Sequence, residues 1–576
     1  MVTIRMRRGI QGLLAALIVA TAWAVVAGGH PRLVDVQVIA FNDFHGNLEP
    51  PTGSNGRIGQ TVSGGVEFMA THIASLRAEN PNTIVVSAGD NIGATPLISG
   101  LFHDEPSIEA LNALGLQVSA VGNHELDEGW WELLRMANGG CHPTDGCQGR
   151  SSFAGARFEF LAANVTLDAG RAPADKLVAS RWKPSKGQPP TLFPPSTIKV
   201  VGGVKVGFIG LTLEGAPKIV SPAALTGLAF YPEAAAANEQ ARALRRKGAS
   251  AVVVLIHEGG DPTGRDPNGC EGMTGPIVDI VAAMSADIDV VVSGHTHRSY
   301  ICMMGTTLVT SAESYSRLVT DIDLQVDPKT RRVVAKHARN VITSRDVPPA
   351  SVETQLIAHY RPMADKVGAR QVGSVLATVD RAGDESRETA LGEMVADAML
   401  EASAGVAKGG AQVALVNIGG VRADLTRPAG AAPGTPTPVT FSDVFNVLPF
   451  GNITIVKTMT GDALARLLNE QFDQRQGRWE MLQVSKGFSY AFDSTKSDGQ
   501  RVDRSSLTID GKPVAMTDTV RVAAVDFVWT GGDRFTVVKE GTDPTTVGDV
   551  LDEFIDYLGR HSPVSPGSRG RVHRVR

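Results

Sequence analysis

The sequence predicts an α/β protein with two large domains, and three observations carry this prediction. Short apolar segments typical of buried strands alternate with helical patterns over residues 34–340. Polar side chains follow several of these segments, as at the active-site edge of α/β sheets. A chain of 576 residues also exceeds one ordinary core, so we expect a second domain after the change of composition near Val326.

The N-terminus has the layout of a secretory signal, which we assign to residues 1–27. Three arginines, Arg5, Arg7 and Arg8, precede an apolar run that ends in small residues. We therefore expect cleavage and export to a periplasm, a cell envelope or the medium, with an uncleaved signal anchor as the alternative. No later segment is apolar for long enough to span a bilayer.

The net charge limits which partners the protein can bind. Removal of the three signal arginines changes the formal net charge from −5 to −8, which argues against broad binding of a nucleic acid polymer.

The four cysteines predict two disulfides in an exported chain, although three pairings are possible. We favour Cys141 with Cys147 and Cys270 with Cys302. A zinc site is the weaker alternative, because paired C-x-x-C knuckles are missing.

The first expected strand, Val34–Phe41, leads directly into Asn42-Asp-Phe-His-Gly46. Asp43 and His45 lie two residues apart, so in an extended segment both would face one cation. A helical run over 64–76 follows, and a second apolar strand, 83–90, ends in a carboxylate at Asp90. Asp90 thus repeats the placement of Asp43.

A third strand, 116–121, ends in Gly-Asn-His-Glu-Leu-Asp. Asn123, His124 and Asp127 place an amide oxygen, an imidazole and a carboxylate within one turn of chain. Further strands are expected near Phe158–Asn164 and at 204–210.

A helix over 233–247 and a strand over 251–257 place His257 at a strand tip. The strand 287–293 is followed by Gly294-His-Thr-His297, where His295 and His297 lie two apart on what we expect to be an extended loop.

Each polar residue alone has an ordinary structural explanation, as a helix cap or a hydrogen-bonded histidine. Their recurrence after five strands of one expected sheet indicates metal binding instead. Imidazole, carboxylate and amide oxygen together suit Mn²⁺, Fe²⁺ or Zn²⁺, and the ligands suffice for two ions.

The second half begins after a charged, Pro-containing stretch and a helical pattern over 352–367. A helix is expected at 387–400, and the strand 414–418 leads into a Gly turn that ends at Arg422. Glycines let the backbone approach a ligand closely, and an arginine can fork onto phosphate oxygens. Phe450 and Phe527 follow in aromatic segments that, taken alone, indicate core residues.

The motif set resembles the metallophosphoesterases, specifically the bacterial periplasmic and animal ecto-5′-nucleotidases. The shared blocks are D-x-H, G-D-N, G-N-H-E-x-D, H-E-G and G-H-x-H, and the C-terminal half is similar block for block. The resemblance implies an α/β (α+β) architecture: a four-layer β-sandwich flanked by helices at 34–340, a linker helix at 341–368 and an α/β nucleotide-binding domain at 369–562. Residues 563–576 match nothing, and we expect them to be disordered.

The same resemblance implies the site residues. Asp43, His45 and His297 would hold one divalent metal ion (Zn, Mn, Co or Mg), Asn123, His257 and His295 the other, and Asp90 would bridge them. His124 and Asp127 would be the catalytic pair. Other polar residues take the place of His297 in some members, which makes it the least secure ligand.

The implied substrate contacts lie in the C-terminal domain. Phe450 and Phe527 would clamp the base and Asp533 would bind the ribose hydroxyls. Arg387, Asn417 and Arg422 would lie near the phosphate, beside the Gly420 turn. Ile418 and Glu393 depart from the pattern and leave a third phosphate contact undecided.

The implied function is an exported 5′-nucleotidase in which metal-activated water removes the 5′-phosphate of AMP and other nucleotides, including di- and triphosphates. Alternatives are a 2′,3′-cyclic-nucleotide 2′-phosphodiesterase with 3′-nucleotidase activity, a UDP-sugar hydrolase and, from another class, a non-catalytic surface nucleotide-binding protein. The native metals, the preferred base and the oligomeric state cannot be read from the sequence.

Overall fold

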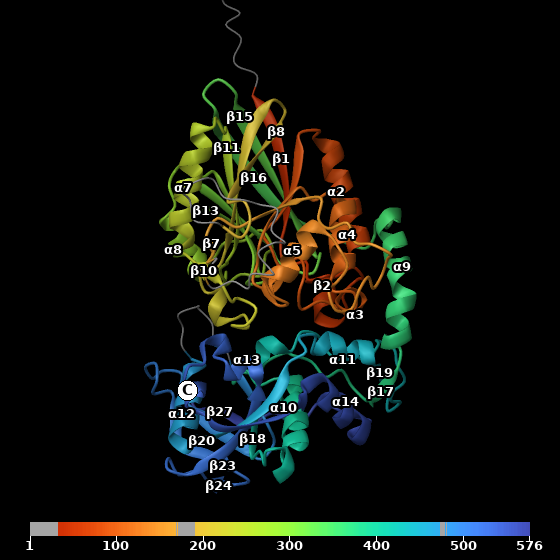
Figure 1. Ribbon diagram of the computed structural model, residues 1–576, viewed down its shortest axis with the longest axis vertical. Coiled ribbons are helices and arrows are strands. Elements are labelled where there is room, and N and C mark those ends of the chain that lie inside the picture. Colours follow the sequence, from red (N-terminus) through yellow and green to blue (C-terminus); the bar gives the residue numbers. More distant parts are fainter. Residues whose placement is uncertain (1–32, 169, 171–190, 473–478, 480) are drawn as a thin grey trace, which may run out of the picture.

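The computed structural model describes residues 33–168, 170, 191–472, 479 and 481–576. Two domains lie one above the other along the long axis, and helix α9 (Ser351–Gly368) runs beside both (Figure 1). The expected signal at residues 1–27 lies outside the described residues. Among those residues, no helix combines the length and apolarity needed to cross a membrane.

The first sheet of the N-terminal domain has six strands, and β1, β4, β5 and β6 within it are parallel. Their carboxyl ends therefore meet at one edge. In sheet order the strands are β16 (Arg332–Ile342), β15 (Leu318–Asp327), β1 (Val34–Phe41), β4 (Thr83–Ser87), β5 (Val118–Ala120) and β6 (Glu159–Leu161).

The second sheet also has six strands, with β9, β11, β12 and β14 parallel. Its outer strands, β8 and β13, run antiparallel to their neighbours. In sheet order the strands are β13 (Ser299–Met304), β14 (Thr307–Ala312), β12 (Val290–Ser293), β11 (Ala251–His257), β9 (Val204–Thr212) and β8 (Ser196–Val201).

The two sheets form a sandwich with helices on both outer faces (Figure 1). One buried cluster joins side chains of both sheets, for example Val38 with Val253, while two further clusters place helices on the outer faces. Burying both faces explains why the strands are almost continuously apolar. The helices are α2 (Val66–Glu79), α3 (Leu97–Gly100), α4 (Glu105–Leu114) and α5 (Trp130–Asn138) on one side, and α7 (Glu233–Arg246) and α8 (Pro276–Ala282) on the other.

Small elements complete this domain. They are the pairs β2 (Arg57–Ile58) with β3 (Thr61–Val62) and β7 (Val165–Leu167) with β10 (Leu228–Phe230). The four cysteines form the two favoured disulfides, Cys141–Cys147 and Cys270–Cys302.

The C-terminal domain is organised around a five-stranded mixed sheet that is covered by helices. In sheet order the strands are β21 (Leu482–Val484), β18 (Val413–Asn417), β25 (Thr519–Val525), β20 (Ile453–Thr460) and β26 (Thr542–Asp549). The helices are α10 (Ala390–Ser403), α11 (Phe441–Val447), α12 (Gly461–Glu470), α13 (Asp526–Trp529) and α14 (Val550–His561). Helix α10 begins at Ala390 rather than at the expected Arg387, because the Thr389 side chain caps it by accepting from the Gly392 N–H.

A second, four-stranded sheet contradicts the expected disorder of residues 563–576. It comprises β24 (Lys512–Pro513), β23 (Val502–Ile509), β22 (Phe488–Phe492) and β27 (Val572–Arg574), while β17 (Gln371–Val375) pairs with β19 (Thr437–Thr440). β27 runs parallel to β22, and the Arg571 guanidinium donates to both carboxylate oxygens of Asp397 at 2.7 and 2.9 Å. The polar composition of the tail does not indicate a strand. The strand with which it pairs, β22, is distant in the sequence.

Candidate active site between the domains

The loop after β1 brings Asp43 and His45 to the sheet edge by an unexpected backbone route. Both residues have positive φ, 51° and 46°, instead of the extended conformation that we predicted. His295 and His297, expected on an extended loop, also have φ values of 71° and 52°. Backbone hydrogen bonds hold the first loop, because Asp43 N–H donates to Gly89 and His45 N–H donates to Asp90. Such strain is concentrated at functional sites.

Asp90 lies at the centre of the candidate metal centre. One of its carboxylate oxygens is 2.9 Å from His257 Nε2 and 3.6 Å from His45 Nε2. The other accepts the His124 backbone N–H at 2.9 Å. A Cβ on Gly122 would lie 2.1 Å from that oxygen, so glycine is needed for this close approach.

The remaining candidate ligands fall into two groups around Asp90. Asp43, His45 and His297 form one, in which His297 Nε2 lies 3.2 Å from both Asp43 Oδ1 and His45 Nε2. Asp90, His257 and His295 form the other. Thus the structure brings these six residues into the two sets that the resemblance implies.

The side chains fit divalent cations. The Nδ1 atoms of His45 and His257 face backbone carbonyls, Gly93 O at 2.8 Å and Ala88 O at 2.9 Å. If each Nδ1 carries the proton and donates it, each Nε2 lone pair points into the cluster, as in metal-binding histidines. The buried Asn123 Oδ1 accepts no hydrogen bond from any described residue, so it too is available as a ligand.

Electrostatics support the same conclusion. Burial lowers the pKa of His45 and of His297 well below the usual range, which keeps both imidazoles neutral, as ligands must be. Burial also lowers the pKa of His257, but the carboxylates of Asp90 and Asp43 raise it by more, to about 10. A cation bound at this position would be stabilised by the same carboxylates.

The proposed catalytic pair lies beside this centre. His124 Nδ1 is 2.7 Å from Asp127 Oδ2, and both side chains are partly exposed. Burial lowers the pKa of His124, but Asp127 and Asp90 raise it by more, so the net pKa lies above the ordinary value. His124 therefore retains a proton more readily than a free imidazole does.

Glu125 is a positioning residue that sequence reasoning missed. Its buried carboxylate accepts the backbone N–H groups of Asp90, Asn91 and Gly122 at 2.6–2.8 Å. It thereby ties the loop after β4 to the loop after β5. Its place in the Gly-Asn-His-Glu block was the available signal.

The C-terminal domain closes the site from the other side. One cavity of about 420 Å³ is lined by residues of both domains. Asp90, Asn123, His124, Asp127, His295 and His297 come from one domain, and Asn417, Gly420, Arg422, Phe450, Phe527 and Asp533 from the other. Asn417 Nδ2 donates to Asp533 Oδ2 at 2.8 Å.

Arg387 is the one expected substrate contact that does not line this cavity. It lines an adjacent cavity and lies over the Trp479 ring, with its Cζ 5.3 Å from the centroid. Sequence spacing could not show this, because Arg387 precedes helix α10 and takes a positive φ of 63°.

The protein has a double sheet flanked by helices, with this cluster at the edge of the sheets, and an α/β domain that faces the cluster. These features define the class of two-domain metallophosphoesterases. Residues 36–299 match the calcineurin-like phosphoesterase family, and residues 366–540 match the 5′-nucleotidase C-terminal domain family. The chain therefore belongs to the 5′-nucleotidase family, and the expected fold class is confirmed.

Individual relatives extend the comparison. The chain is 28% identical to endonuclease YhcR of Bacillus subtilis (strain 168) over 94% of its own length, but it spans only 41% of that relative. It is also 28% identical to cell wall protein Lmo0130 of Listeria monocytogenes, over 91% of this chain and 67% of that protein. The solved 5′-nucleotidase precursor of Thermus thermophilus has a TM-score of 0.74 at 25% identity, covering 94% of this chain and 99% of that chain.

Proposed function

We propose that the chain is an exported, metal-dependent phosphohydrolase that removes the 5′-phosphate of nucleotides. The observation that carries this proposal is the shared cavity, in which His124 and Asp90 lie at one end and Phe450, Phe527 and Asp533 line the other domain's side. A cavity with convergent polar groups and aromatic walls suits a small ligand with one charged end.

The nucleoside end is proposed to bind in the C-terminal domain. Phe450 and Phe527 offer π faces for the base, and Asp533 offers oxygens for the ribose hydroxyls. Arg422 Nε and Nη2 are buried and donate to no described residue, which suits them to phosphate oxygens. The buried Asn417 Oδ1 likewise has no partner among the described residues.

The metal ligands are proposed as Asp43, His45 and His297 for one ion and Asn123, His257 and His295 for the other, with Asp90 shared. Two divalent ions, when bound, lower the pKa of water and neutralise charge on phosphoryl oxygens. His124, held by Asp127, donates a hydrogen bond to the phosphoryl oxygens or a proton to the leaving ribose oxygen.

The domain limits remain part of the proposal: a catalytic domain at 34–340, a linker at 341–368 and a substrate domain at 369–562. Because the two parts of the site belong to different domains, we propose that turnover needs their closure about helix α9. Export is supported by the N-terminal sequence pattern and by a relative whose name places it in the cell wall.

A substrate panel tests the proposed function. The purified chain is stripped of metal, reloaded in turn with Mn²⁺, Co²⁺, Zn²⁺ or Mg²⁺, and assayed with AMP, 3′-AMP, cyclic 2′,3′-AMP and UDP-glucose. We expect the highest kcat/KM with AMP. A preference for the cyclic substrate or UDP-glucose would overturn the choice of 5′-nucleotidase, and a metal-loaded chain inactive on all four would favour a binding protein.

Polymeric nucleic acid belongs in the same panel, because one relative is named an endonuclease. The formal net charge of −5 argues against a broad electrostatic surface for a polymer. Faster cleavage of RNA or DNA than of AMP would therefore contradict the proposal.

A further inference from the structure

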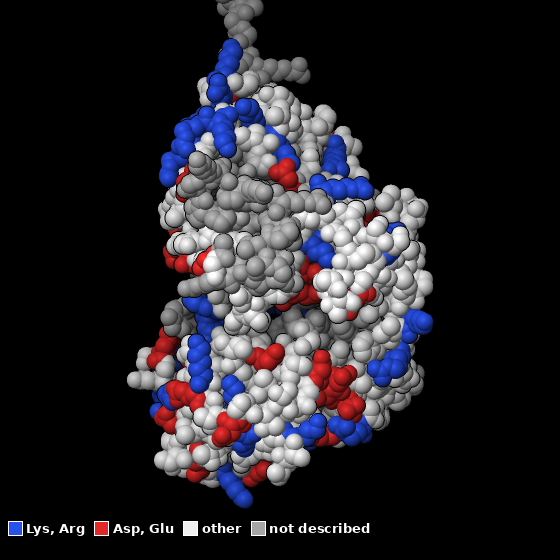
Figure 2. Space-filling model, in the orientation of Figure 1, with Lys and Arg blue, Asp and Glu red and all other residues white. Residues whose placement is uncertain are grey.

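A second, larger cavity adjoins the proposed active site, and a monophosphate does not account for it. It measures about 1370 Å³ and lies between the domains, where the surface is hollowed (Figure 2). His297 and Arg422 line both cavities, so the larger one begins at the metal centre. The smaller cavity contains the proposed base and ribose contacts and, in Asn417 and Arg422, proposed phosphate contacts, whereas Arg387 lines the larger one.

The larger cavity is strongly basic. Seven arginines and three aspartates line it. Arg298 pairs with Asp261 at 2.8 Å and Arg381 with Asp424 at 3.3 Å. The third aspartate, Asp380, pairs at 3.3 Å with an arginine outside the lining. The remaining five arginines of the lining have no ion-paired carboxylate among the described residues: Arg57, Arg345, Arg387, Arg422 and Arg427. Of these, Arg345 donates to the backbone carbonyls of Gly64, Pro51 and Ser63.

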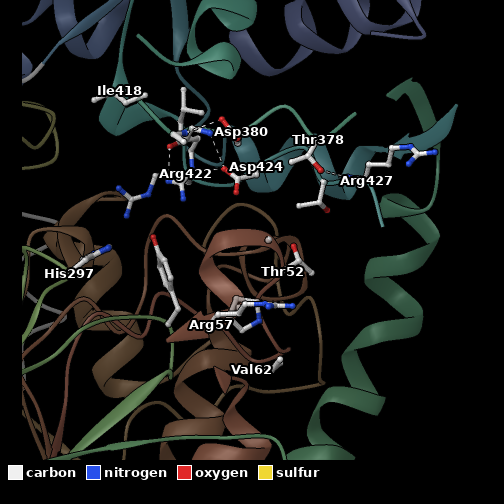
Figure 3. A pocket seen from close by; sticks show the side chains of 18 of the residues that line it. Thr52, Arg57, Val62, His297, Thr378, Asp380, Ile418, Arg422, Asp424 and Arg427 are labelled. Atoms are coloured by element: carbon white, nitrogen blue, oxygen red, sulfur yellow. Dashed lines mark hydrogen bonds and ion pairs between the residues drawn. The ribbon is translucent and has the colours of Figure 1, made fainter. Parts of the chain in front are cut away.

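These arginines come from both domains. Figure 3 shows Arg57 on the N-terminal side, and Arg422 and Arg427 on the C-terminal side. Arg57 is exposed on strand β2, and no hydrogen bond or ion pair of its guanidinium to a described residue is found. Arg427 Nη2 donates to the carbonyls of its own loop, at Ala432 and Thr435. Arg422 Nη1 donates to Gly419 O, while its Nε and Nη2 have no partner among the described residues. The free donors of Arg57 and Arg422, which come from opposite domains, fit the oxygens of a phosphate.

A largely buried aromatic side chain, 7% exposed, also borders this cavity. Tyr315 lines it, and the Tyr315 ring packs against the His297 ring with 5.2 Å between centroids. An aromatic ring beside a basic cavity suits a nucleotide more than an isolated anion.

We propose that this basic cavity is a second phosphate subsite, which binds the neighbouring phosphate of a short oligonucleotide whose 3′-terminal nucleoside occupies the Phe450 and Phe527 side. The proposal rests on the proposed function, since it places the scissile phosphate at the metal centre. Arg57 is a specificity-determining residue in this arrangement, because it meets only the additional phosphate. AMP, which ends at the metal centre, does not reach it.

Inhibition of p-nitrophenyl phosphate hydrolysis tests the subsite, with the dinucleotide ApA and the trinucleotide ApApA as competitors of the metal-loaded enzyme. Neither has a terminal phosphate, and only ApApA carries a phosphodiester beyond the one placed at the metals. We expect ApApA to inhibit with a Ki roughly tenfold lower than that of ApA, as for one charge-assisted contact. Arg57→Ala should remove this advantage, and Arg57→Lys should retain part of it.

Control variants and a third competitor distinguish loss of the additional phosphate contact from a general effect on the enzyme. Arg332→Ala, an exposed arginine outside the cavity lining, should leave both inhibition constants unchanged, and Arg57→Ala should leave KM for AMP within about twofold, since only the extra phosphate contact is lost. Inorganic phosphate is the third competitor, and its Ki should not respond to Arg57→Ala.

Three outcomes would overturn the subsite. They are equal Ki values for ApA and ApApA in the wild type, equal effects of Arg57→Ala on both, or an equal effect on inorganic phosphate, which would indicate a site for the free ion. These outcomes are distinguishable from failure of the proposed function. Loss of the AMP preference in the substrate panel would leave the ratio of the two inhibition constants untouched.

Discussion

The imidazole of His124 stacks on the ring of Phe450, with 5.7 Å between the centroids and 24° between the planes. His124 belongs to the loop after β5, whereas Phe450 follows helix α11 in the other domain. The contact therefore joins the proposed catalytic group directly to a proposed base platform. Arg422 adds to it, with its Cζ 5.8 Å from the same Phe450 ring.

Replacement of His124 by alanine should reduce catalysis without removing metal. We expect kcat for AMP to fall by on the order of 10²-fold or more, because the donor to the phosphoryl or leaving oxygen is lost. Metal analysis should show an unchanged metal content, since the proposed ligand side chains remain. Turnover equal to that of the wild type would end the catalytic assignment.

Asp90 is expected to govern both metal positions. Asp90→Asn removes the carboxylate that faces His45 and His257, so the metal content should fall for both ions together. The measurement is the metal-to-protein ratio after dialysis against trace metal. If one ion were retained at full occupancy, Asp90 would not be the shared ligand.

The C-terminal tail should stabilise its domain. Arg571→Ala removes the cation bound to Asp397 and leaves Glu393, which lies 3.7 Å from Arg571 Nε, in a buried acidic group. We expect a loss of about 3–5 kcal/mol in the free energy of unfolding, the usual cost of breaking a buried pair.

The matched control is His573→Ala, because this exposed residue of β27 has no side-chain hydrogen bond or ion pair with a described residue. Its effect should stay within about 0.5 kcal/mol in urea denaturation. Equal stabilities of the two variants would show that the tail does not contribute through Arg571.

Glu353 should make stability depend on pH. This side chain in helix α9 is buried, and burial raises its pKa from the ordinary 4.5 to about 8. Between these values the folded state binds a proton that the unfolded state releases, so stability falls as pH rises from about 4.5 to about 8.

The variant Glu353→Gln should lose this contribution, whose slope is at most about 1.4 kcal/mol per pH unit. Unfolding free energies of both proteins at pH 5, 6.5 and 8 provide the check. A difference between the two proteins that does not change with pH would contradict the assignment.

Much of the catalytic domain could be predicted because its strands are buried on both faces. Val34–Phe41 and Ala251–His257 were expected with the bounds that the structure has. Parallel strands place their carboxyl ends at one edge, so residues as distant as Asp43 and His257 could be expected to meet.

What could not be predicted depends on contacts between distant segments. The pairing of β27 with β22 requires Glu388 and Asp397 to receive the tail, and the tail composition carries no sign of them. The stacking of His124 on Phe450 depends on how the domains close. The positive φ of His45 likewise reflects hydrogen bonds to a neighbouring loop rather than a local preference.

The central claim is that the C-terminal domain binds the nucleoside while the N-terminal domain binds the phosphate. Replacement of Phe450 is a poor test of this division. Because Phe450 contacts His124, its loss should lower kcat/KM for every substrate. Phe527 is the better probe, since it lines the cavity on α13 and the ring contacts of His124 do not include it.

The most direct test is therefore kcat/KM of Phe527→Ala for AMP and for p-nitrophenyl phosphate. A stacking contact of about 1–3 kcal/mol predicts a several-fold to hundred-fold loss with AMP and little change with the small ester. Equal losses on the two substrates would show that the C-terminal domain supports the metal centre instead of binding the nucleoside, and would contradict the two-domain account.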